Sequence, residues 1–340
     1  MTDQKIVTVL GGGSFGTVLA NTLASNGHRT RLWMRNSEDA ARTQETRVNG
    51  KYLPDYPLHE NLTIGSDLIE ASTDSELVLF SVPSSSVRSV AKLIAPSLKP
   101  GTCILSTAKG IETGSFMLMS QVLEQELPGM RIGALSGPNL AKEIAMGFPA
   151  ASVVASKDHS MCDFVQDTLG SEIFRIYSAD DIYGIELAGA LKNIYAIVTG
   201  FSSALGMGHN TNGMLITRSL AEMSRLAVRL GANPLTFLGL AGVGDLIVTC
   251  MSDLSRNYQV GYQVGLGKTL DQAVADIGQT AEGVNTLKLV KLKAEELDVY
   301  MPLVTGLHKI LLEDADVDEV VRGLMLGDKA QDVDFGLDLL

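Results

Sequence analysis

The sequence predicts a chain of two parts, an N-terminal α/β part built on a doubly wound, mostly parallel sheet and a C-terminal all-α part. In the first half, short β-rich runs alternate with helical patterns, as in a parallel sheet covered by helices. After Tyr177 the β-branched runs thin out, and long stretches rich in Ala, Leu, Gly and Met follow. The length of 340 residues also exceeds what one hydrophobic core usually supports. We therefore expect two domains, at residues 1–179 and 180–340.

Short apolar runs give the strands of the first domain. They lie near residues 6–10, 29–34, 77–82, 103–106, 132–136, 151–155 and 173–176. A helix at about residues 14–25 ends at Asn26-Gly27, where glycine can adopt the left-handed backbone conformation that terminates a helix. Residues 44–57 contain one glycine and two prolines and are predicted to form a long surface connection.

Helical patterns fill the second domain. Asp180 or Asp181 can cap a helix that continues to about residue 205, and Thr211 or Asn212 can cap another that runs to about residue 230. Further helices are predicted at residues 234–240, 255–265, 269–278, 283–297, 305–312 and 317–324. The second domain is therefore expected to be all-helical.

The composition indicates a globular, acidic protein. Hydrophobic residues make up 45% of the chain and charged residues 19%, a balance that supports a large core. The formal net charge of -12 disfavours nucleic acid and anionic lipid partners, because no run of Lys or Arg offsets it. An anionic small substrate must then meet a few local cations.

Cysteine and histidine usage gives no sign of disulfides or metal. The three cysteines are far apart and the five histidines show no ligand spacing, so we expect buried reduced thiols and no metal site. The N-terminus lacks the basic start and long apolar stretch of a secretion signal. Apolar runs also fall short of the roughly 20 residues that a membrane-spanning helix needs. We expect a cytoplasmic protein without stable membrane insertion.

Gly11, Gly13 and Gly16 form a GxGxxG pattern directly after the first predicted strand and at the start of the first helix. Gly11 permits a tight turn, Gly13 lets backbone approach a pyrophosphate, and Gly16 lets helix and strand pack closely. The strand, the helix and the second strand around this pattern indicate a Rossmann dinucleotide-binding domain. The alternative is a tight turn that binds no ligand.

Arg35 follows the second predicted strand, where a domain that prefers NAD(H) carries an acidic side chain for the ribose. A guanidinium suits a 2'-phosphate instead. We therefore expect the cofactor to be NADP(H), NAD(H) or both. The alternative is an ordinary exposed arginine without a ligand.

Two further loops follow strands of the same predicted sheet, with the sequences SVPSSSV and STAKGIE. Ligands collect at the carboxyl ends of parallel strands, so both loops are expected near the cofactor. Lys109, in the second loop, would carry a cation close to a bound nicotinamide. The alternative is a solvated loop lysine.

Two isolated charges mark the helical half. Lys192 is the only Lys or Arg in residues 176–217, and Asp245 is the only acidic residue in residues 223–252. A buried ammonium needs a carboxylate, an anionic ligand or the loss of its proton. We therefore expect Lys192 to exchange a proton with a substrate oxygen. Asp245 suits a substrate hydroxyl or a lysine partner, and we expect the two residues to meet. The alternatives are a lysine that extends to water and a carboxylate that caps the following helix.

Ser255, Arg256 and Asn257 open another predicted helix. A hydroxyl, a guanidinium, an amide and the unpaired N–H groups of a helix start together suit a phosphate group. The alternative is an ordinary helix cap followed by a surface arginine.

Taken together, the chain resembles the bacterial-type NAD(P)-dependent glycerol-3-phosphate dehydrogenases over nearly its whole length. The segments that carry the resemblance are GGGSFGTVLA, SVPSSSVR, STAKGIE, LSGPNLAKEIA, ELAGALKNIYAIVTG, GHNTNGMLITRSLAEMSRL, GLAGVGDLIVTCMSDLSRNYQVG and AEGVNT. The resemblance implies reversible reduction of dihydroxyacetone phosphate to sn-glycerol 3-phosphate by NAD(P)H, for phospholipid synthesis. It also implies a Rossmann domain followed by an all-helical substrate domain, usually as a homodimer.

The resemblance also assigns site residues. Lys192 matches the family's proton-exchanging lysine, Lys109 the lysine that touches cofactor and substrate, and Asp245 the carboxylate near them. The substrate side is completed by Gly137, Asn139, Ser255, Arg256 and Asn257. The cofactor side comprises Gly11, Gly13, Ser14, Phe15, Gly16, Arg35, Lys109, Ala141, Arg256, Thr280 and Glu282.

One departure from the family is visible at Tyr258-Gln259, where relatives often carry further basic residues; it puts phosphate or cofactor affinity in doubt, not the reaction.

Two other functions fit part of the pattern. One is a β-hydroxyacid or 6-phosphogluconate-type dehydrogenase, which the SRN and GVGD segments disfavour. The other is a non-catalytic NADP(H)-binding sensor, which has no reason to bear the burial cost of Lys192 and Asp245.

Overall fold

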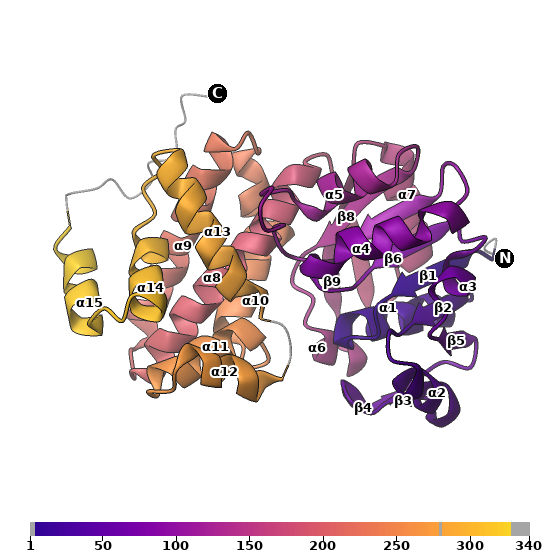
Figure 1. Ribbon diagram of the computed structural model, residues 1–340, viewed down its shortest axis with the longest axis horizontal. Coiled ribbons are helices and arrows are strands. Elements are labelled where there is room, and N and C mark those ends of the chain that lie inside the picture. The colour runs from indigo at the N-terminus through magenta and orange to yellow at the C-terminus, as the bar shows by residue number, and fades with distance from the viewer. Residues whose placement is uncertain (1–3, 279–280, 328–340) are drawn as a thin grey trace. The chain divides into compact units, whose positions relative to one another are not determined.

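The computed structural model of the chain describes residues 4–278 and 281–327 (Figure 1). Its backbone forms two compact units, Met1–Glu186 and Leu187–Leu340. The assignment of cofactor binding to residues 1–179 and of substrate binding to residues 180–340 stays a prediction.

The N-terminal unit contains an eight-stranded sheet in the order β10-β9-β8-β7-β6-β1-β2-β5. Its strands are β1 (Ile6–Leu10), β2 (Arg29–Trp33), β5 (Leu62–Gly65), β6 (Leu77–Phe80), β7 (Cys103–Ser106), β8 (Arg131–Ser136), β9 (Ala150–Ser156) and β10 (Phe174–Ala179). Neighbouring strands are parallel except β8 and β9, which pair antiparallel. The predicted sheet and its predicted strands are confirmed. β5 is an addition, because its residues LTIG form too short a run to signal a strand.

Helices cover both faces of this sheet (Figure 1). Alternate residues of a strand point to opposite faces, so Leu77 and Leu79 of β6 join one apolar cluster while Val78 and Phe80 join another. The first cluster packs against α1 (Ser14–Ser25), α6 (Ala141–Ala145) and α7 (His159–Leu169). The second packs against α3 (Leu68–Ser72), α4 (Ser84–Ile94) and α5 (Met119–Glu126). The doubly wound arrangement is therefore confirmed.

Residues 44–57 are mostly exposed or half-buried, as predicted for a surface connection, but they also contain regular structure. This segment contains the end of α2 (Ser37–Thr46) and an antiparallel pair, β3 (Val48–Asn49) and β4 (Leu53–Pro57). The buried side chain of Asn49 donates from Nδ2 to Gly12 O at 2.9 Å and to Thr17 Oγ1 at 2.8 Å. The pair is thus tied to the glycine-rich turn by contacts that its prolines and glycine do not reveal.

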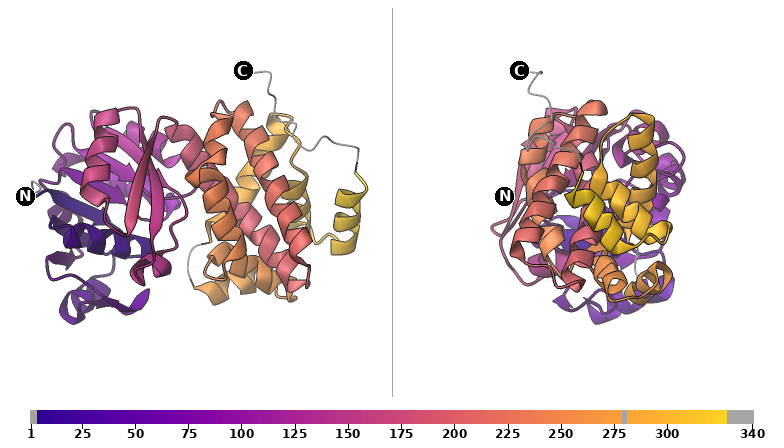
Figure 2. Two further views of the ribbon diagram at one scale, coloured as in Figure 1. Left: turned by 180° about the vertical axis from the view of Figure 1, so that it is seen from behind. Right: turned by 90° about the vertical axis from the view of Figure 1, so that its left-hand side faces the viewer.

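In the C-terminal unit the described residues form helices and turns and no strand (Figure 2). The long helix α8 (Ile182–Ala204) is capped by Asp181, whose Oδ1 accepts from Gly184 N at 2.8 Å, as predicted. The helices that follow are α9 (His209–Arg229), the 3₁₀ helix η2 (Pro234–Leu238), the π-helical turn η3 (Leu240–Gly244), α10 (Asp245–Met251), α11 (Arg256–Gly265), α12 (Leu270–Ile277), α13 (Glu282–Glu296), α14 (Pro302–Leu312) and α15 (Val317–Met325).

Two of these elements differ from the sequence prediction. Helix α9 begins before the predicted caps Thr211 and Asn212, because the extended Gly208 serves as its N-cap. The helix predicted at residues 234–240 is a 3₁₀ turn that passes into η3 and then α10. The glycines in GLAGVGD hide the onset of α10 from a pattern-based prediction.

Helices α8 and α11 pack with their backbones in close contact. A Cβ atom on Gly200 of α8 would lie 2.0 Å from Tyr258 O, and one on Gly261 of α11 would lie 2.0 Å from Ile197 O. Only glycine fits at both points, so the crossing of the two helices is fixed in position. The N-terminal end of α11, which starts at Arg256, is thereby held against the helix that carries Lys192.

Candidate functional site

The glycine-rich turn between β1 and α1 needs glycine at two positions. Gly11 has a φ of +120°, and a Cβ atom there would lie 2.6 Å from Ser81 O. A Cβ atom on Gly16 would lie 2.0 Å from Gly11 O. The predicted roles of these glycines in the tight turn and in close packing are confirmed. Beside Gly13, by contrast, no atom of another described segment lies within 4 Å of a Cβ position, so this backbone has room for a ligand.

The N-terminal end of α1 is suited to an anion. Gly13 is the N-cap and provides no side-chain cap, and the first turn contains no acidic residue. The N–H groups of the first helical residues, Ser14, Phe15 and Gly16, have no acceptor within the helix. Together with the helix dipole they favour a negative group. The turn therefore fits the pyrophosphate of a dinucleotide.

The other predicted cofactor residues lie on different elements. Arg35 follows β2, is exposed, and forms no side-chain hydrogen bond or ion pair with the described residues. Ala141 is the half-buried first residue of α6, and Glu282 is the half-buried first residue of α13. Thr280 lies outside the described residues. An exposed guanidinium at the end of β2 is compatible with a 2'-phosphate.

The loops that follow β7 and β8 bring three predicted residues together. The half-buried Lys109 donates from Nζ to Gly137 O at 3.0 Å and to Asn139 Oδ1 at 2.9 Å. Parallel neighbouring strands end at the same edge of a sheet, which explains why STAKGIE and SGPN meet. These two hydrogen bonds fix the direction of the ammonium.

Lys192 and Asp245 form a buried ion pair, as predicted. Lys192 Nζ lies 2.6 Å from Asp245 Oδ1, and only 6% of Lys192 and 1% of Asp245 are exposed. Lys192 Nζ also donates to Thr249 Oγ1, one helical turn after Asp245. Thr249 is a member of the site that charge patterns miss; its i+4 spacing from Asp245 is the only signal in the sequence.

Asp245 does not cap the helix that it begins. Helix α10 has Gly244 as its N-cap, with no side-chain cap, and the carboxylate of Asp245 faces Lys192 instead. The π-helical turn η3 leads directly into α10 and so sets the start of that helix. Such turns are frequent at functional sites. The capping alternative for Asp245 is therefore wrong.

Ser255 and Asn257 have structural contacts of their own. Ser255 Oγ accepts from Tyr258 N at 3.3 Å as the N-cap of α11, and Asn257 Oδ1 accepts from Gly283 N at 3.0 Å near the start of α13. Both residues are buried, whereas Arg256 between them is half-buried. The Ser255 hydroxyl keeps its own proton for donation, so capping and phosphate binding are compatible.

Two buried glutamates on α8 and α9 hold the starts of other helices. Glu186 Oε1 accepts from Ser120 N at 3.0 Å at the start of α5, and Glu222 Oε1 accepts from Leu303 N at 2.6 Å at the start of α14. Burial raises the pKa of each carboxyl to about 7. The sequence analysis missed both residues, because nothing in their local pattern indicates which distant helix they contact.

Within residues 4–278 and 281–327, no group of three His, Cys, Asp or Glu side chains is placed to hold a metal ion. No helix in the same ranges combines the length and apolar character of a membrane span. Cys103, Cys162 and Cys250 are buried and not linked by disulfides. The candidate functional groups are therefore the glycine-rich turn, the Lys109 loop, and the Lys192 ion pair with the start of α11.

Comparison with known proteins gives one family for both units. A family model described as the N-terminus of NAD-dependent glycerol-3-phosphate dehydrogenase matches residues 6–162, and one described as its C-terminus matches residues 181–322. The chain is 59% identical over 334 residues to a protein from Saccharophagus degradans, and the matched region covers 98% of this chain and 93% of that protein. It is also 59% identical over 334 residues to one from Teredinibacter turnerae, with 98% of each chain covered. Both carry the name glycerol-3-phosphate dehydrogenase (NAD(P)+).

Solved structures agree with this result. A glycerol-3-phosphate dehydrogenase from Coxiella burnetii superposes with a TM-score of 0.91 at 37% identity, over 95% of this chain and 99% of that chain. One from Plasmodium falciparum superposes with a TM-score of 0.86 over 96% of this chain and 97% of that chain, and its 24% identity supports the fold alone.

Proposed function

The chain belongs to the NAD-dependent glycerol-3-phosphate dehydrogenase family, and we propose that Lys192, paired with Asp245, carries the proton transfer of its reaction. The protein is an NAD(P)-dependent oxidoreductase that interconverts dihydroxyacetone phosphate and sn-glycerol 3-phosphate. The observation that supports this role for Lys192 is the buried ion pair between Lys192 Nζ and Asp245 Oδ1, at 2.6 Å.

Lys192 acts as the acid in the direction of ketone reduction. The bound cofactor supplies the hydride. The ketone oxygen develops negative charge and needs a proton, and the Lys192 ammonium has three N–H donors. Asp245 and Thr249 accept from two of them, so the third is available to the substrate oxygen. A positioned acid of this kind contributes about 10²- to 10⁴-fold to the rate.

Asp245 keeps the lysine charged and oriented. A buried ammonium is costly unless a carboxylate lies beside it, and removal of one partner of such a pair costs about 3–5 kcal/mol. After Lys192 has given its proton to the substrate, the adjacent carboxylate favours the return of a proton to Nζ. Asp245 thereby resets the acid for the next turnover, and its hydrogen bond fixes the direction of Nζ.

The phosphate of the substrate is bound by groups that do not take part in proton transfer. We assign it to Arg256 and its neighbours Ser255 and Asn257 at the start of α11, since a guanidinium and helix N–H groups suit a phosphate. On the sheet side the substrate contacts are Lys109, Gly137 and Asn139. Binding energy from the phosphate positions the reacting carbonyl, which raises kcat as well as lowering KM.

The cofactor lies along the glycine-rich turn, and Arg35 binds a 2'-phosphate when NADP(H) is used. The residues assigned to it are Gly11, Gly13, Ser14, Phe15, Gly16, Arg35, Lys109, Ala141, Arg256, Thr280 and Glu282. The φ of +120° at Gly11 and the open backbone at Gly13 support this assignment. The enzyme is further proposed to act as a homodimer in the cytoplasm, and to supply sn-glycerol 3-phosphate for phospholipids.

A spectrophotometric assay with two substrates tests the proposal. Purified protein is expected to oxidise NADPH or NADH with dihydroxyacetone phosphate and to be far slower with unphosphorylated dihydroxyacetone. In Arg256→Ala, KM for dihydroxyacetone phosphate should rise by about 10- to 100-fold, as expected for the loss of a charged hydrogen bond. Equal rates with both ketones, or an unchanged KM in the variant, would remove the phosphate site from the start of α11. A panel of β-hydroxyacids and 6-phosphogluconate tests the other dehydrogenase function.

A further inference from the structure

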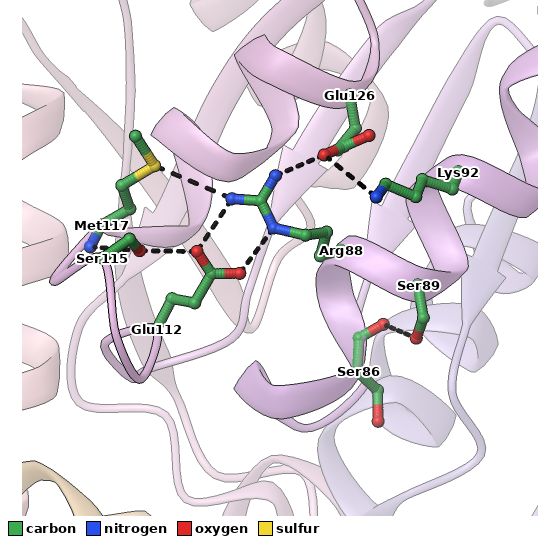
Figure 3. A network of polar contacts seen from close by, with 8 residues as sticks. All are labelled: Ser86, Arg88, Ser89, Lys92, Glu112, Ser115, Met117 and Glu126. Atoms are coloured by element: carbon green, nitrogen blue, oxygen red, sulfur yellow. Dashed lines mark hydrogen bonds and ion pairs between the residues drawn. The ribbon is translucent and has the colours of Figure 1, made fainter.

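The loop that carries Lys109 is hydrogen-bonded to an arginine of helix α4. The loop comprises residues 107–118, between β7 and α5, and its only ladder contact within the described residues is the isolated bridge between Ile111 and Leu118. Connections of this length without regular structure are uncommon. Two backbone hydrogen bonds lie within this one, from Glu112 N to Met117 O at 2.8 Å and from Phe116 N to Glu112 O at 3.1 Å, and side-chain contacts add to them. Arg88 of α4 lies beside the loop and provides such contacts (Figure 3).

Arg88 grips Glu112 with two parallel hydrogen bonds. Its Nε donates to Glu112 Oε1 at 2.6 Å and its Nη2 donates to Glu112 Oε2 at 2.8 Å. Ser115 Oγ donates to the same carboxylate at 2.6 Å. This bidentate geometry is stronger and more directional than a single ion contact. The hydrogen bonds from Arg88 lower the pKa of Glu112 to about 2, which agrees with a carboxylate that stays ionised.

The same guanidinium also contacts helix α5. Arg88 Nη1 donates to Glu126, the last residue of α5, and Nη2 lies 3.8 Å from Met117 Sδ near the end of the loop. Lys92 adds a second cation, 3.9 Å from Glu126 Oε1. Arg88 therefore links α4, the middle of the loop and the far end of α5 (Figure 3).

These contacts bear on Lys109 because Glu112 lies three residues after it in the same loop. Gly110 and Ile111, between them, are buried, so the intervening backbone is enclosed. At its tip Lys109 Nζ reaches Gly137 O and Asn139 Oδ1. The Arg88–Glu112 pair fixes the middle of the loop, and the direction of Lys109 depends on where that part of the loop lies.

We propose that Arg88, acting through Glu112, is a positioning residue for Lys109 in the glycerol-3-phosphate dehydrogenase reaction. The proposal rests on the role of Lys109 in substrate and cofactor binding given above. Arg88 itself contacts neither, and its effect is on the placement of the Lys109 ammonium. Misplacement of a binding group by about 1 Å can cost up to about 100-fold in rate, so a brace of this kind has a measurable effect.

A mutant cycle between Arg88 and Lys109 tests the proposal. Arg88→Ala is expected to lower kcat/KM for dihydroxyacetone phosphate by about tenfold, mostly through KM. In a Lys109→Met background the same substitution should change kcat/KM by less than about twofold, because the group that Arg88 positions is gone. Arg88→Lys, which keeps the charge but loses the bidentate geometry, should recover only part of the loss.

Arg131→Ala is the matched control. Arg131 forms a similar ion pair in the same unit, with Nε 2.6 Å from Asp158 Oδ2. Arg131 is the first residue of β8 and Gly137 follows its last residue, so the control lies at the opposite end of the strand from the contact with Lys109. The control should lose comparable thermal stability and change kcat/KM by less than about twofold in both backgrounds. Hydrogen exchange of the ligand-free protein gives a readout independent of activity: Arg88→Ala should speed exchange in residues 107–118, and Arg131→Ala should not.

The outcomes separate two kinds of failure. An equal loss from Arg88→Ala in the wild-type and Lys109→Met backgrounds would mean that Arg88 does not act through Lys109, and would overturn the inference alone. Wild-type kcat/KM in Lys109→Met would overturn both the proposed role of Lys109 and the inference that depends on it. Unchanged exchange in residues 107–118 of Arg88→Ala would also contradict the inference, whatever the activity.

Discussion

The two lysines of the proposed site have different surroundings. Lys109, on a loop at the strand ends, is half-buried and donates to the neutral oxygens of Gly137 and Asn139. Lys192, inside helix α8, is 6% exposed and lies 2.6 Å from the carboxylate of Asp245. The oxygens of Gly137 and Asn139 fix the direction of the Lys109 ammonium, whereas the carboxylate of Asp245 balances the charge of Lys192 inside the helical unit.

This difference suggests a division of labour. On the proposed assignment, the strand-end loops bind anionic parts of the ligands, and the helices around α8 carry the ion pair that serves the chemistry. A local loop cation is sufficient for binding, because the phosphate brings the opposite charge. Proton transfer needs a low-dielectric environment in which the lysine has a fixed partner.

The largest expected effect comes from Lys192→Ala. If Lys192 is the acid, kcat should fall by about 10³-fold or more, with a much smaller change in KM. The substitution leaves Asp245 buried without its partner, so the melting temperature must be measured as well. A double variant, Lys192→Met with Asp245→Asn, removes the unbalanced charge and should recover stability but not turnover. A kcat close to that of the wild type in either variant would mean that Lys192 is not the acid of the reaction.

The second effect concerns pH and stability. Burial raises the pKa of Glu222 to about 7 from its ordinary value of 4.5, so the folded protein binds more protons than the unfolded chain between these values. Stability should therefore fall as pH rises from about 4.5 to 7, by up to about 3 kcal/mol for this residue. Glu186 on α8 acts in the same direction, with a pKa raised to about 7. Thermal melts between pH 5 and pH 8 should be less pH-dependent in Glu222→Gln, and least so when Glu186→Gln is added.

Glu112, in the strand-end loop, provides the opposite case. Arg88 lowers its pKa to about 2, so its contribution to stability is present above pH 4.5 and is lost only as pH falls toward 2. Glu112 is partly exposed, and solvent limits the contribution to about 1 kcal/mol. Glu112→Gln should therefore leave the melting curves between pH 5 and pH 8 parallel to those of the wild type. A slope that changes in Glu112→Gln and not in Glu222→Gln would reverse the comparison.

The same contrast explains what the sequence could predict. The glycine-rich turn could be predicted because its function depends on local backbone geometry. Gly11 and Gly16 are close to one another in the chain, so the sequence pattern shows both. The Lys192–Asp245 pair, separated by 53 residues, could be predicted for another reason. Each residue is the only charge of its kind in a long apolar segment, and a buried charge requires a partner. When a buried charge is isolated in the sequence, few oppositely charged residues can be its partner, even at a long distance along the chain.

Other contacts have no such signal. Arg88, Glu112 and Glu126 lie among several charges, and nothing in the spacing shows which of them pair. Asn49 reaches the glycine-rich turn from the β3–β4 pair, across more than 30 residues, and its neighbours look like a surface loop. These contacts depend on the packing of separate elements, so they could be seen only in the structure.

A smaller effect is expected at Arg35, the exposed cation of the strand-end region. If it binds a 2'-phosphate, Arg35→Ala should lower the ratio of kcat/KM for NADPH to that for NADH by about tenfold, through KM for NADPH. The turnover with saturating NADH should be unchanged, because Arg35 takes no part in the chemistry. Arg42→Ala, at an exposed arginine on α2, is the control and should leave the ratio as it is. An unchanged ratio in Arg35→Ala would exclude Arg35 as a determinant of cofactor choice.

The smallest effect, and the most direct test of the comparison, comes from Asn139→Asp. This substitution places a carboxylate where Asn139 Oδ1 now lies, 2.9 Å from Lys109 Nζ. The added charge should raise KM for dihydroxyacetone phosphate by about fivefold, because it balances the ammonium and repels the phosphate, and solvent screens part of the effect. The increase should shrink at high ionic strength, while kcat changes little. Asn139→Ala removes the acceptor without adding charge, so it must raise KM less than Asn139→Asp does. If the two variants raise KM equally, a negative charge at position 139 does not affect phosphate binding, and the comparison of the loop lysine with the helix lysine loses its support.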